Sequence, residues 1–312
     1  MKYLNFSELG KFEKMFGFKN ELKWKSIFIV AFIHIFGMYW SFYYASLAKW
    51  QSIAFAIWMY IFFSGMGITC GVHRLWTHKS YKATMPLRIY LMVCFASTGQ
   101  NSIYDWVRDH RLHHKFSDTE ADPHNANRGF WFSHIGWLVM KKNSLVLEKG
   151  KQIDMSDIQQ DPVAIYSNQL SIIFCYILPT LTGILLWDEK WQCAVAWQCF
   201  IRVLAVFHAE MTVNSFAHMF GYKPYNVNIK PLQNLFVSTI TLGEGWHNYH
   251  HIFPYDCKAA ETFDLLNFST LLIRTWAKLG LAYDLKEPSP QLIATVVKKN
   301  RHLLSNEPIL NQ

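Results

Sequence analysis

The sequence predicts an all-α integral membrane protein with four transmembrane helices in two hairpins and a cytosolic helical cap that holds a histidine-rich site for two metal ions. Three observations support this fold class. Of the 312 residues, 51% are hydrophobic and 17% are aromatic, which is more than a soluble domain usually needs. The apolar residues gather in long uncharged blocks. Histidines recur in short clusters where those blocks end.

Residues 26–72 are expected to form the first hairpin. Residues 26–48 contain no Asp, Glu, Lys or Arg and are long enough to cross a hydrocarbon core, which needs about 20 helical residues. Lys49 and Gln51 interrupt before residues 52–72, which are again uncharged. Residues 1–25 mix lysines with glutamates before any apolar run, so they predict a cytosolic, interfacial lead-in and not a secretory signal.

Residues 168–213 are expected to form the second hairpin. The apolar runs 168–187 and 191–213 are separated only by Asp188, Glu189 and Lys190. Arg202, His208 and Glu210 interrupt the last run, and ionisable residues inside a membrane span suggest function by default. The apolar segment 87–99 is too short to span, so it predicts a helix that is buried or lies at the interface.

The distribution of basic residues predicts the orientation of the hairpins. The two short loops carry one lysine each, whereas residues 1–25, 73–167 and 214–312 hold nearly all the Lys and Arg. Because positive residues stay on the cytosolic side, both termini and the segments 73–167 and 214–312 should face the cytosol.

Charge and cysteine content limit the other classes of protein. A net charge of +8 suits anionic headgroups or a polyanionic substrate as well as nucleic acid, so composition alone does not choose a partner. The six cysteines form no CxxC pair, so neither a disulfide framework nor a zinc knuckle is indicated.

The chemistry of the sequence lies in its fourteen histidines. The motifs HRLHH (110–114) and HNYHH (247–251) each place rings at positions i, i+3 and i+4, on one face of a helix. In HRLWTH (73–78), five residues separate His73 from His78, so on an ideal helix the rings converge only if the helix ends or bends between them. Lone histidines such as His34 and His302 are expected to be surface or satisfied core residues.

These clusters predict a transition-metal site. Eight imidazoles without thiolates or close carboxylate pairs favour a borderline metal over calcium or magnesium. Eight ligands exceed what one ion takes, so two irons or two zincs are the natural count, and redox chemistry needs iron.

HRLWTH, HRLHH and HNYHH together resemble the three histidine boxes of membrane fatty acyl-CoA desaturases. Further segments are similar to the framework of that family, in particular residues 121–126 (ADPHNA), 133–138 (SHIGWL) and 243–247 (GEGWH). The resemblance extends from about Trp24 to Leu285 and is closest to the animal stearoyl-CoA desaturase branch, including insect enzymes.

The resemblance implies nine histidine ligands and a water molecule held by an asparagine. The ninth ligand would be His218, and Asn214, one helical turn earlier, would hold the water. The implied metal ligands are His73, His78, His110, His113, His114, His218, His247, His250 and His251. His124 and His134 match framework positions and are expected to be hydrogen-bonded structural residues, and the role of His208 stays open.

The resemblance also implies a substrate site. It places the coenzyme A headgroup on Asn101, Arg108, Asp109, Lys141 and Lys142, with Lys141 in place of a family arginine. Gln100, Tyr104 and Trp106 would line a kinked acyl tunnel. Glu210 and Met211 replace a threonine and tryptophan pair of the vertebrate enzymes, so Glu210 must be neutral or partnered. Ile61 and Gly65, one turn apart, would form the floor of the tunnel.

As a member of this family, the protein would be an oxygen-dependent, multi-pass enzyme of the endoplasmic reticulum membrane. Its cofactors would be two Fe²⁺ ions with O₂ as co-substrate, and no catalytic residue is expected beyond the metal centre. Its partners would be a long-chain acyl-CoA, the bilayer, and cytochrome b5 with its NADH-dependent reductase, but no nucleic acid. A Δ9 product is expected, with other positions open. A di-iron lipid hydroxylase and a non-catalytic metal-binding membrane protein are the alternatives, whereas a transporter is poorly supported.

Overall fold

The computed structural model of the chain describes residues 20–261 and 267–306, the last five of these by their backbone alone. Four apolar helices long enough to cross a membrane dominate it: Trp24–Leu47, Trp50–Thr77, Ala164–Trp187 and Trp191–Met219. The predicted all-α class with four long apolar helices is confirmed.

Each long helix contains α-helical and π-helical turns, and the 3-10 turns η2 and η7 stand at the end of the first helix and the start of the third. The first comprises α2 (Trp24–Ala31), η1 (Phe32–Phe36), α3 (Gly37–Tyr44) and η2 (Ala45–Leu47). The second comprises α4 (Trp50–Trp58), η3 (Met59–Gly65) and η4 (Gly67–Thr77). The third comprises η7 (Ala164–Tyr166), α10 (Ser167–Ile172), η8 (Ile173–Ile177) and α11 (Leu178–Trp187). The fourth comprises α12 (Trp191–Val195), η9 (Ala196–Ile201), α13 (Arg202–Asn214) and α14 (Phe216–Met219).

The second and fourth helices are longer than the sequence predicts. They have 28 and 29 residues, whereas a bilayer core needs about 20, so their last turns extend past the apolar runs. The second helix thereby carries His73, and the fourth continues past Asn214 to His218. Both helices thus end in proposed metal-binding residues.

The two short loops meet at the far end of these helices. The Lys49 ammonium donates to the carbonyl oxygens of Trp187 (2.8 Å) and Asp188 (2.6 Å). The buried Glu189 carboxylate accepts from the Lys49 backbone N–H (2.8 Å) and from the Ser52 hydroxyl (2.5 Å). These bonds tie the first pair of long helices to the second.

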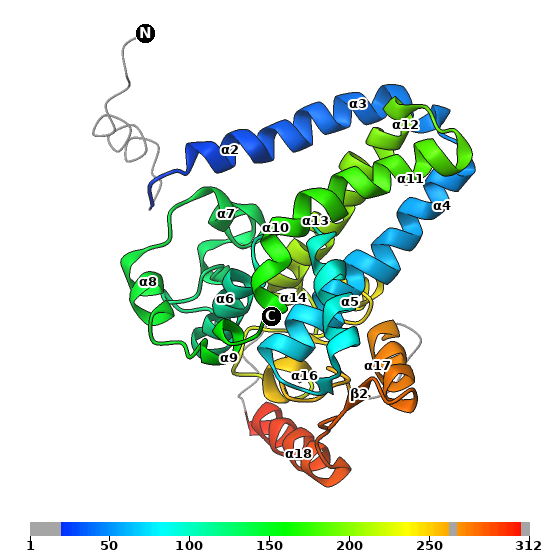
Figure 1. Cartoon of the computed structure of the whole chain (residues 1–312). Helices are drawn as coiled ribbons and strands as arrows, with labels where there is room; N and C mark the ends of the chain where they lie inside the picture. The colour runs from blue at the N-terminus through cyan, green and yellow to red at the C-terminus, as the bar shows by residue number, and fades with distance from the viewer. Residues whose placement is uncertain (1–19, 262–266, 307–312) are drawn as a thin grey trace.

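The other elements are short and gather at the opposite end of the long helices (Figure 1). They are β1 (Lys82–Ala83), α5 (Met85–Ala96), α6 (Ile103–Phe116), η5 (Ala126–Arg128), η6 (Phe132–Gly136), α7 (Trp137–Val139), α8 (Ser144–Gly150), α9 (Ser156–Gln159), α15 (Leu235–Ile240), α16 (His247–Ile252), α17 (Phe268–Lys278), β2 (Ala282–Tyr283) and α18 (Pro290–Asn306). The two strands pair antiparallel, with Lys82 opposite Tyr283. We expected a helix over 87–99, and α5 forms it.

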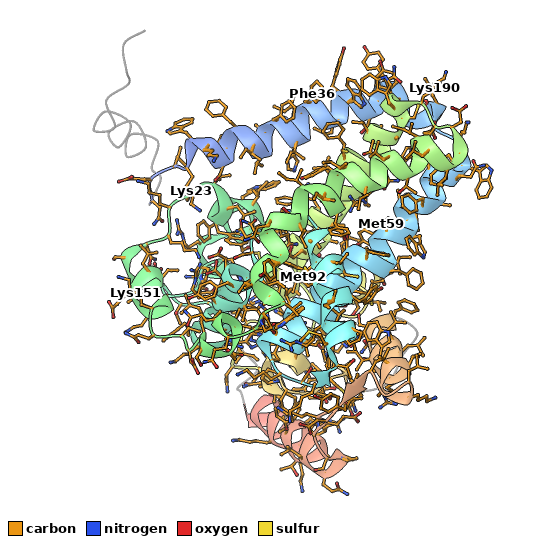
Figure 2. All side chains as sticks on the ribbon, in the orientation of Figure 1. Lys23, Phe36, Met59, Met92, Lys151 and Lys190 are labelled. Carbon is orange, nitrogen blue, oxygen red and sulfur yellow. The ribbon has the colours of Figure 1, made fainter. Side chains whose placement is uncertain are left out.

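The main core lies where η4, α5, α6 and α17 meet. Leu91, Phe95, Ile103, Val107 and Ile273 are fully buried there. The first long helix is packed very differently, since it runs along one edge of the molecule (Figure 1) and only 6% of its most apolar stretch is buried, against 50% for the fourth helix. Figure 2 shows its side chains, including Phe36, projecting from that edge.

Candidate metal centre and adjoining cavity

Nine histidines converge in two clusters at the end of the long helices that faces α6 and α16. In each cluster the ligand nitrogens all lie within 4.8 Å of one another. The first cluster is His73, His78, His110, His114 and His250, and the second is His113, His218, His247 and His251. These nine are the histidines that the resemblance implies as ligands.

A π-helical turn brings His73 and His78 together. In a π-helix the backbone N–H of residue i+5 bonds to the carbonyl of residue i, so a step of five residues completes about one turn. The N–H of His78 donates to the carbonyl of His73 (3.1 Å) at the end of η4, and the ring centroids lie 4.9 Å apart. The helix does end here, as the sequence requires, but the π-helical geometry is what aligns the two rings.

Each HxxHH motif contributes to both clusters. On α6, His110 and His114 belong to the first cluster, while His113 belongs to the second. On α16, His250 belongs to the first, and His247 and His251 to the second. The helices α6 and α16 therefore lie between the clusters and hold their spacing. Ser102 fixes the start of α6, because its hydroxyl accepts from the N–H of Asp105 (3.1 Å).

Three buried carboxylates orient rings of the clusters. The Nδ1–H groups of His73, His113 and His218 donate to Glu244 (2.8 Å), Asp122 (2.9 Å) and Asp118 (3.0 Å). With the proton held at Nδ1, the Nε2 lone pair points into the cluster. Sequence reasoning missed these roles, although Asp122 and Glu244 lie in the framework segments noted above. The available signal was a carboxylate a few residues from HRLHH and from HNYHH.

The electrostatics keep three of the rings neutral and Glu244 charged. Burial, followed by the neighbouring imidazoles, holds the pKa values of His78, His110 and His250 well below the usual range. Burial alone would raise the pKa of Glu244, but His73 and Arg74 lower it to about 2. Neutral imidazoles are the form that binds metal ions.

The donor set fits metal ions. Within each cluster, Nε2 atoms lie close to one another. The distances are 2.9 Å between His73 and His250 in the first cluster, and 3.0 Å (His218 and His247) and 3.1 Å (His251 and His247) in the second. Where Nδ1 carries the proton, as on His73 and His218, Nε2 presents a lone pair. Lone pairs that face one another repel unless a cation lies between them, and two groups of imidazoles suit two borderline cations.

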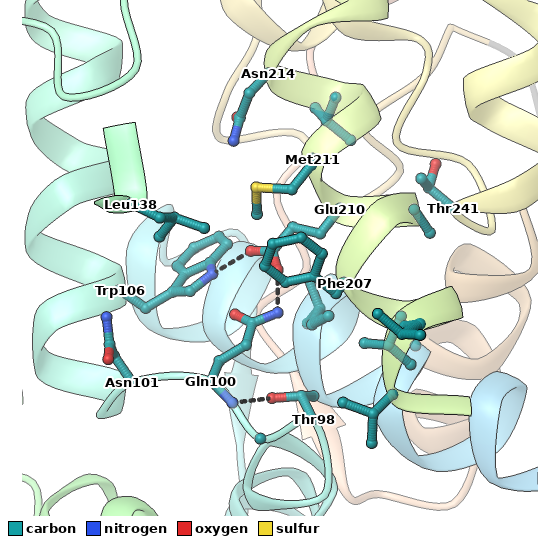
Figure 3. A pocket seen from close by; sticks show the side chains of 18 of the residues that line it. Thr98, Gln100, Asn101, Trp106, Leu138, Phe207, Glu210, Met211, Asn214 and Thr241 are labelled. Atoms are coloured by element: carbon teal, nitrogen blue, oxygen red, sulfur yellow. Dashed lines mark hydrogen bonds between the residues drawn. The ribbon is translucent and has the colours of Figure 1, made fainter. Parts of the chain in front are cut away.

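A cavity adjoins the clusters and is lined by residues of all four long helices. His73, His110 and His247 lie at its metal end, and Asn214 also lines it. Apolar residues such as Ile33, Val203 and Phe207 form its walls. Figure 3 shows Asn214 and Met211 on the same helix, with their side chains directed into the cavity.

Glu210 is partnered inside this cavity. One carboxylate oxygen accepts from the Trp106 indole N–H (2.7 Å), and the other accepts from the Gln100 amide (Figure 3). Met211 is buried beside it. The expectation that Glu210 needs a partner is met, because two donors from the α6 region satisfy both of its oxygens.

The residues expected to bind the coenzyme A headgroup differ in their distance from the cavity. Asn101 and Asp109 line the cavity, and Asp109 accepts from Lys142 (2.5 Å) and Arg108 (3.2 Å). Lys141 is turned to Glu21 (2.5 Å) instead. A basic residue that the sequence reasoning did not include, Lys23, donates to the carbonyl of Leu138 (3.3 Å), next to these groups.

Two tunnel residues lie off the cavity. Tyr104 packs against the main core, and Ile61 is replaced along the cavity by Tyr60. The prediction for Ile61 assumed α-helical spacing to Gly65, but η3 is π-helical, so residues five apart share a line and Tyr60 aligns with Gly65. Gly65 does line the cavity, and Leu242 packs so closely on it that an added Cβ would lie 2.5 Å from its Cδ1.

Among the histidines outside the clusters, His134 and His208 are alike and His124 differs from them. His134 donates or accepts hydrogen bonds with both ring nitrogens, as expected for a structural residue, and so does His208. His124 does not follow the expectation, since its Nδ1 has no hydrogen-bond partner among the described residues and lies 3.6 Å from a carboxylate oxygen of Asp122. Its ring instead contacts that of His113, with centroids 4.3 Å apart, and lines the cavity.

Comparison with known proteins agrees with this geometry. A family model described as "Fatty acid desaturase" matches residues 48–284. The chain is 43% identical to an acyl-CoA Delta-9 desaturase of Acheta domesticus, over 90% of this chain and 80% of that protein. It is 43% identical to stearoyl-CoA desaturase of Homo sapiens (90% and 79%) and 45% identical to an acyl-CoA Delta(11) desaturase of Spodoptera littoralis (88% and 82%). The chain belongs to the fatty acid desaturase family.

Proposed function

We propose that the protein is an oxygen-dependent acyl-CoA desaturase that introduces a double bond into a long-chain fatty acyl-CoA at a di-iron centre. The observation that carries the proposal is the convergence of nine histidines in two clusters at the end of an apolar cavity. The names of the relatives, all acyl-CoA desaturases, support the substrate class.

The proposed cofactors are two Fe²⁺ ions, one for each cluster, with Asn214 holding a water at the centre. Iron bound there would supply the oxidant, derived from O₂, that removes hydrogen from an unactivated methylene. The overall reaction balances when O₂, two electrons, two protons and the two hydrogens of neighbouring methylenes give two water molecules and one carbon–carbon double bond.

The residues of the chain do the positioning. Lys142 and Arg108 would bind the phosphates of coenzyme A beside Asn101 at one end of the cavity, since cations donate charge-assisted hydrogen bonds to phosphate. The apolar walls would hold the acyl chain and keep water out of the site. Because Lys141 is paired with Glu21 near the surface, we assign it a minor part.

The bridge from Trp106 through Glu210 to Gln100 would fix where the acyl chain bends. It crosses from the α6 region to α13 at the cavity wall, next to Met211 (Figure 3). The bend would decide which two carbons face the metal end. A Δ9 product is the proposed outcome, with the Glu210 and Met211 pair as the feature that would shift it.

Electrons would come from membrane-bound cytochrome b5 and its NADH-dependent reductase, and the proposed location is the endoplasmic reticulum membrane with both termini cytosolic. Glycosylation tags test the topology. Tags inserted after Lys49 or Glu189 should be modified, and tags at either terminus should not. The reverse pattern would overturn this orientation.

Expression in a yeast strain that lacks its own desaturase tests the activity. The wild-type protein should restore growth without added unsaturated fatty acid, and mass spectrometry should locate a new double bond in the acyl chains. Full-length protein in the membrane without any unsaturated product would contradict the proposal. Hydroxylated acyl chains in its place would favour a di-iron lipid hydroxylase.

A further inference from the structure

A row of three histidines lies outside the two clusters and crosses between the long helices. His34 Nε2, on η1, lies 3.0 Å from His208 Nε2, on α13. The other ring nitrogen of His208 lies 3.1 Å from His134 Nε2, on η6. His134 Nδ1 in turn lies 2.9 Å from the hydroxyl of Ser215. These four residues are called the histidine row below.

The histidine row is anchored to a backbone carbonyl at each end. The Val30 carbonyl can only accept, so His34 carries its proton at Nδ1 and donates it there (2.7 Å). At the other end, the Ser215 hydroxyl donates to the Met211 carbonyl (2.8 Å), and its oxygen lies 2.9 Å from His134 Nδ1. Burial lowers the pKa of His134, in keeping with neutral rings. The two carbonyls thus hold the ends of the row, and its three contacts measure 3.0, 3.1 and 2.9 Å.

One end of the row lies at the corner between α13 and α14. Ser215 is fully buried and interrupts the helix there, with φ −109° and ψ −71°. Its carbonyl accepts from the N–H of His218 (3.2 Å), and Asn214 directly precedes it. The orientation of Ser215 therefore sets how Asn214 and His218 approach the metal end of the cavity.

The other end of the row lies on the first long helix, which lines the cavity with Ile29, Val30, Ile33 and His34. This helix is held at its ends, by Lys23 N–H to the Val139 carbonyl (2.7 Å) and by the Trp40 indole to the Gln192 carbonyl (3.0 Å). Between these two, among residues 24–39, His34 is the one side chain seen to hydrogen-bond to another helix. It thus ties the middle of a cavity wall to the Ser215 corner.

We propose that His34, His208 and His134 are positioning residues. They link the position of the first long helix, which forms part of the cavity wall, to the orientation of the corner between α13 and α14, which carries Asn214 and His218. This inference rests on the proposed function. It predicts that breaking the row in the middle impairs turnover and metal retention more than it impairs acyl-CoA binding.

Two variants of equal size at His208 test the row. His208→Asn can still donate from its amide nitrogen and accept at its amide oxygen, whereas His208→Leu can do neither. We expect kcat of the Leu variant to fall about tenfold, with KM for acyl-CoA within about twofold of wild type. Iron should also leave the purified Leu variant faster in the presence of a ferrous chelator. The Asn variant should stay close to wild type in all three measurements.

Trp40→Phe is the matched control, because it removes one hydrogen bond near the far end of the same helix without touching the row. Its kcat and rate of iron release should equal those of wild type. If the Leu variant does not fold, His34→Phe against His34→Gln makes the same comparison, since glutamine keeps a donor and an acceptor at this position and phenylalanine keeps neither.

Equal behaviour of the Leu and Asn variants would overturn the proposal, and so would a Trp40→Phe variant as impaired as His208→Leu. Both results would mean that the row only holds helices together. Failure of the proposed function is recognised separately, since the wild-type protein itself would then neither retain iron nor desaturate acyl-CoA.

Discussion

The histidine clusters and the cavity beside them are built in different ways. The ligand nitrogens come from four short stretches of sequence, and three of the rings are oriented by buried carboxylates. The cavity is lined by single residues scattered over all four long helices and the segments between them. Local spacing therefore specifies which histidines share a helix face, whereas only the packing of the whole molecule specifies the cavity.

The histidine clusters and the cavity should also differ in how well they tolerate substitutions. A metal site requires fixed ligands at fixed geometry, so small changes disturb it strongly. An apolar wall with a flexible methionine, such as Met211, adapts to changes of shape. Changes in the clusters should therefore abolish the reaction, while changes in the cavity should redirect it.

The largest effect is expected for a ligand. His113→Ala should lower desaturation more than about 100-fold and reduce bound iron, because it opens a coordination position and leaves Asp122 without its imidazole partner. The same outcome is expected for alanine at each of the other eight histidines. Activity per amount of membrane protein and iron content are the measurements. His302→Ala, on α18, is the control and should be active; full activity of His113→Ala would remove His113 from the site.

A carboxylate that orients a ring should come next. Glu244→Gln keeps an acceptor for His73 but loses the negative charge that also pairs with Arg74 (2.9 Å). Iron affinity should fall about 10- to 100-fold in a chelator competition. Asp157→Asn is the matched control, since that carboxylate binds Arg111 (2.7 Å) and Lys79 (2.9 Å) and no histidine. If both variants bound iron equally, the orienting role of Glu244 would be wrong.

A change in the cavity should alter the product and not the metal. The double variant Glu210→Thr with Met211→Trp replaces the bridge to Gln100 and Trp106 and puts a rigid ring at the wall. The ratio of products from saturated chains of several lengths should change on the order of tenfold, as one altered contact in an apolar pocket allows. Iron content should stay as in wild type. An unchanged product profile would move selectivity elsewhere, towards Tyr60 and Gly65.

The smallest effect is expected at the headgroup. Lys142→Ala should raise KM for acyl-CoA several-fold, about three to ten, because it removes a shielded cation beside Arg108 and Asp109. Lys141→Ala should change KM less than about twofold, since its pair with Glu21 is 59% and 61% exposed. Steady-state kinetics with one acyl-CoA measure both, and a larger effect at Lys141 would reverse our assignment.

The sequence predicts the helical frame well because hydrophobic blocks and charge are local properties. Uncharged runs gave the four long helices, and the spacing in HxxHH gave rings on one face of α6 and α16. It could not show that each motif divides between two clusters, because that depends on how α6 and α16 pack against each other.

The structure differs from the sequence predictions where the backbone is π-helical and α-helical spacing does not apply. The π-helical turns of the second long helix align His73 with His78 and replace Ile61 by Tyr60 along the cavity. Nothing in these residue types distinguishes a π-turn from an α-turn. The partners of Glu210 were equally out of reach, because Gln100 and Trp106 are more than a hundred residues away along the chain.

Metal analysis of the purified wild-type protein tests the central claim, a di-iron centre built from nine histidines, most directly. Elemental analysis of protein isolated in detergent, with His113→Ala prepared in parallel, gives the metal and its ratio to the chain. The account predicts two irons per wild-type chain and fewer in the variant. Zinc in place of iron, one metal ion per chain, or an unchanged iron content in the variant would contradict it.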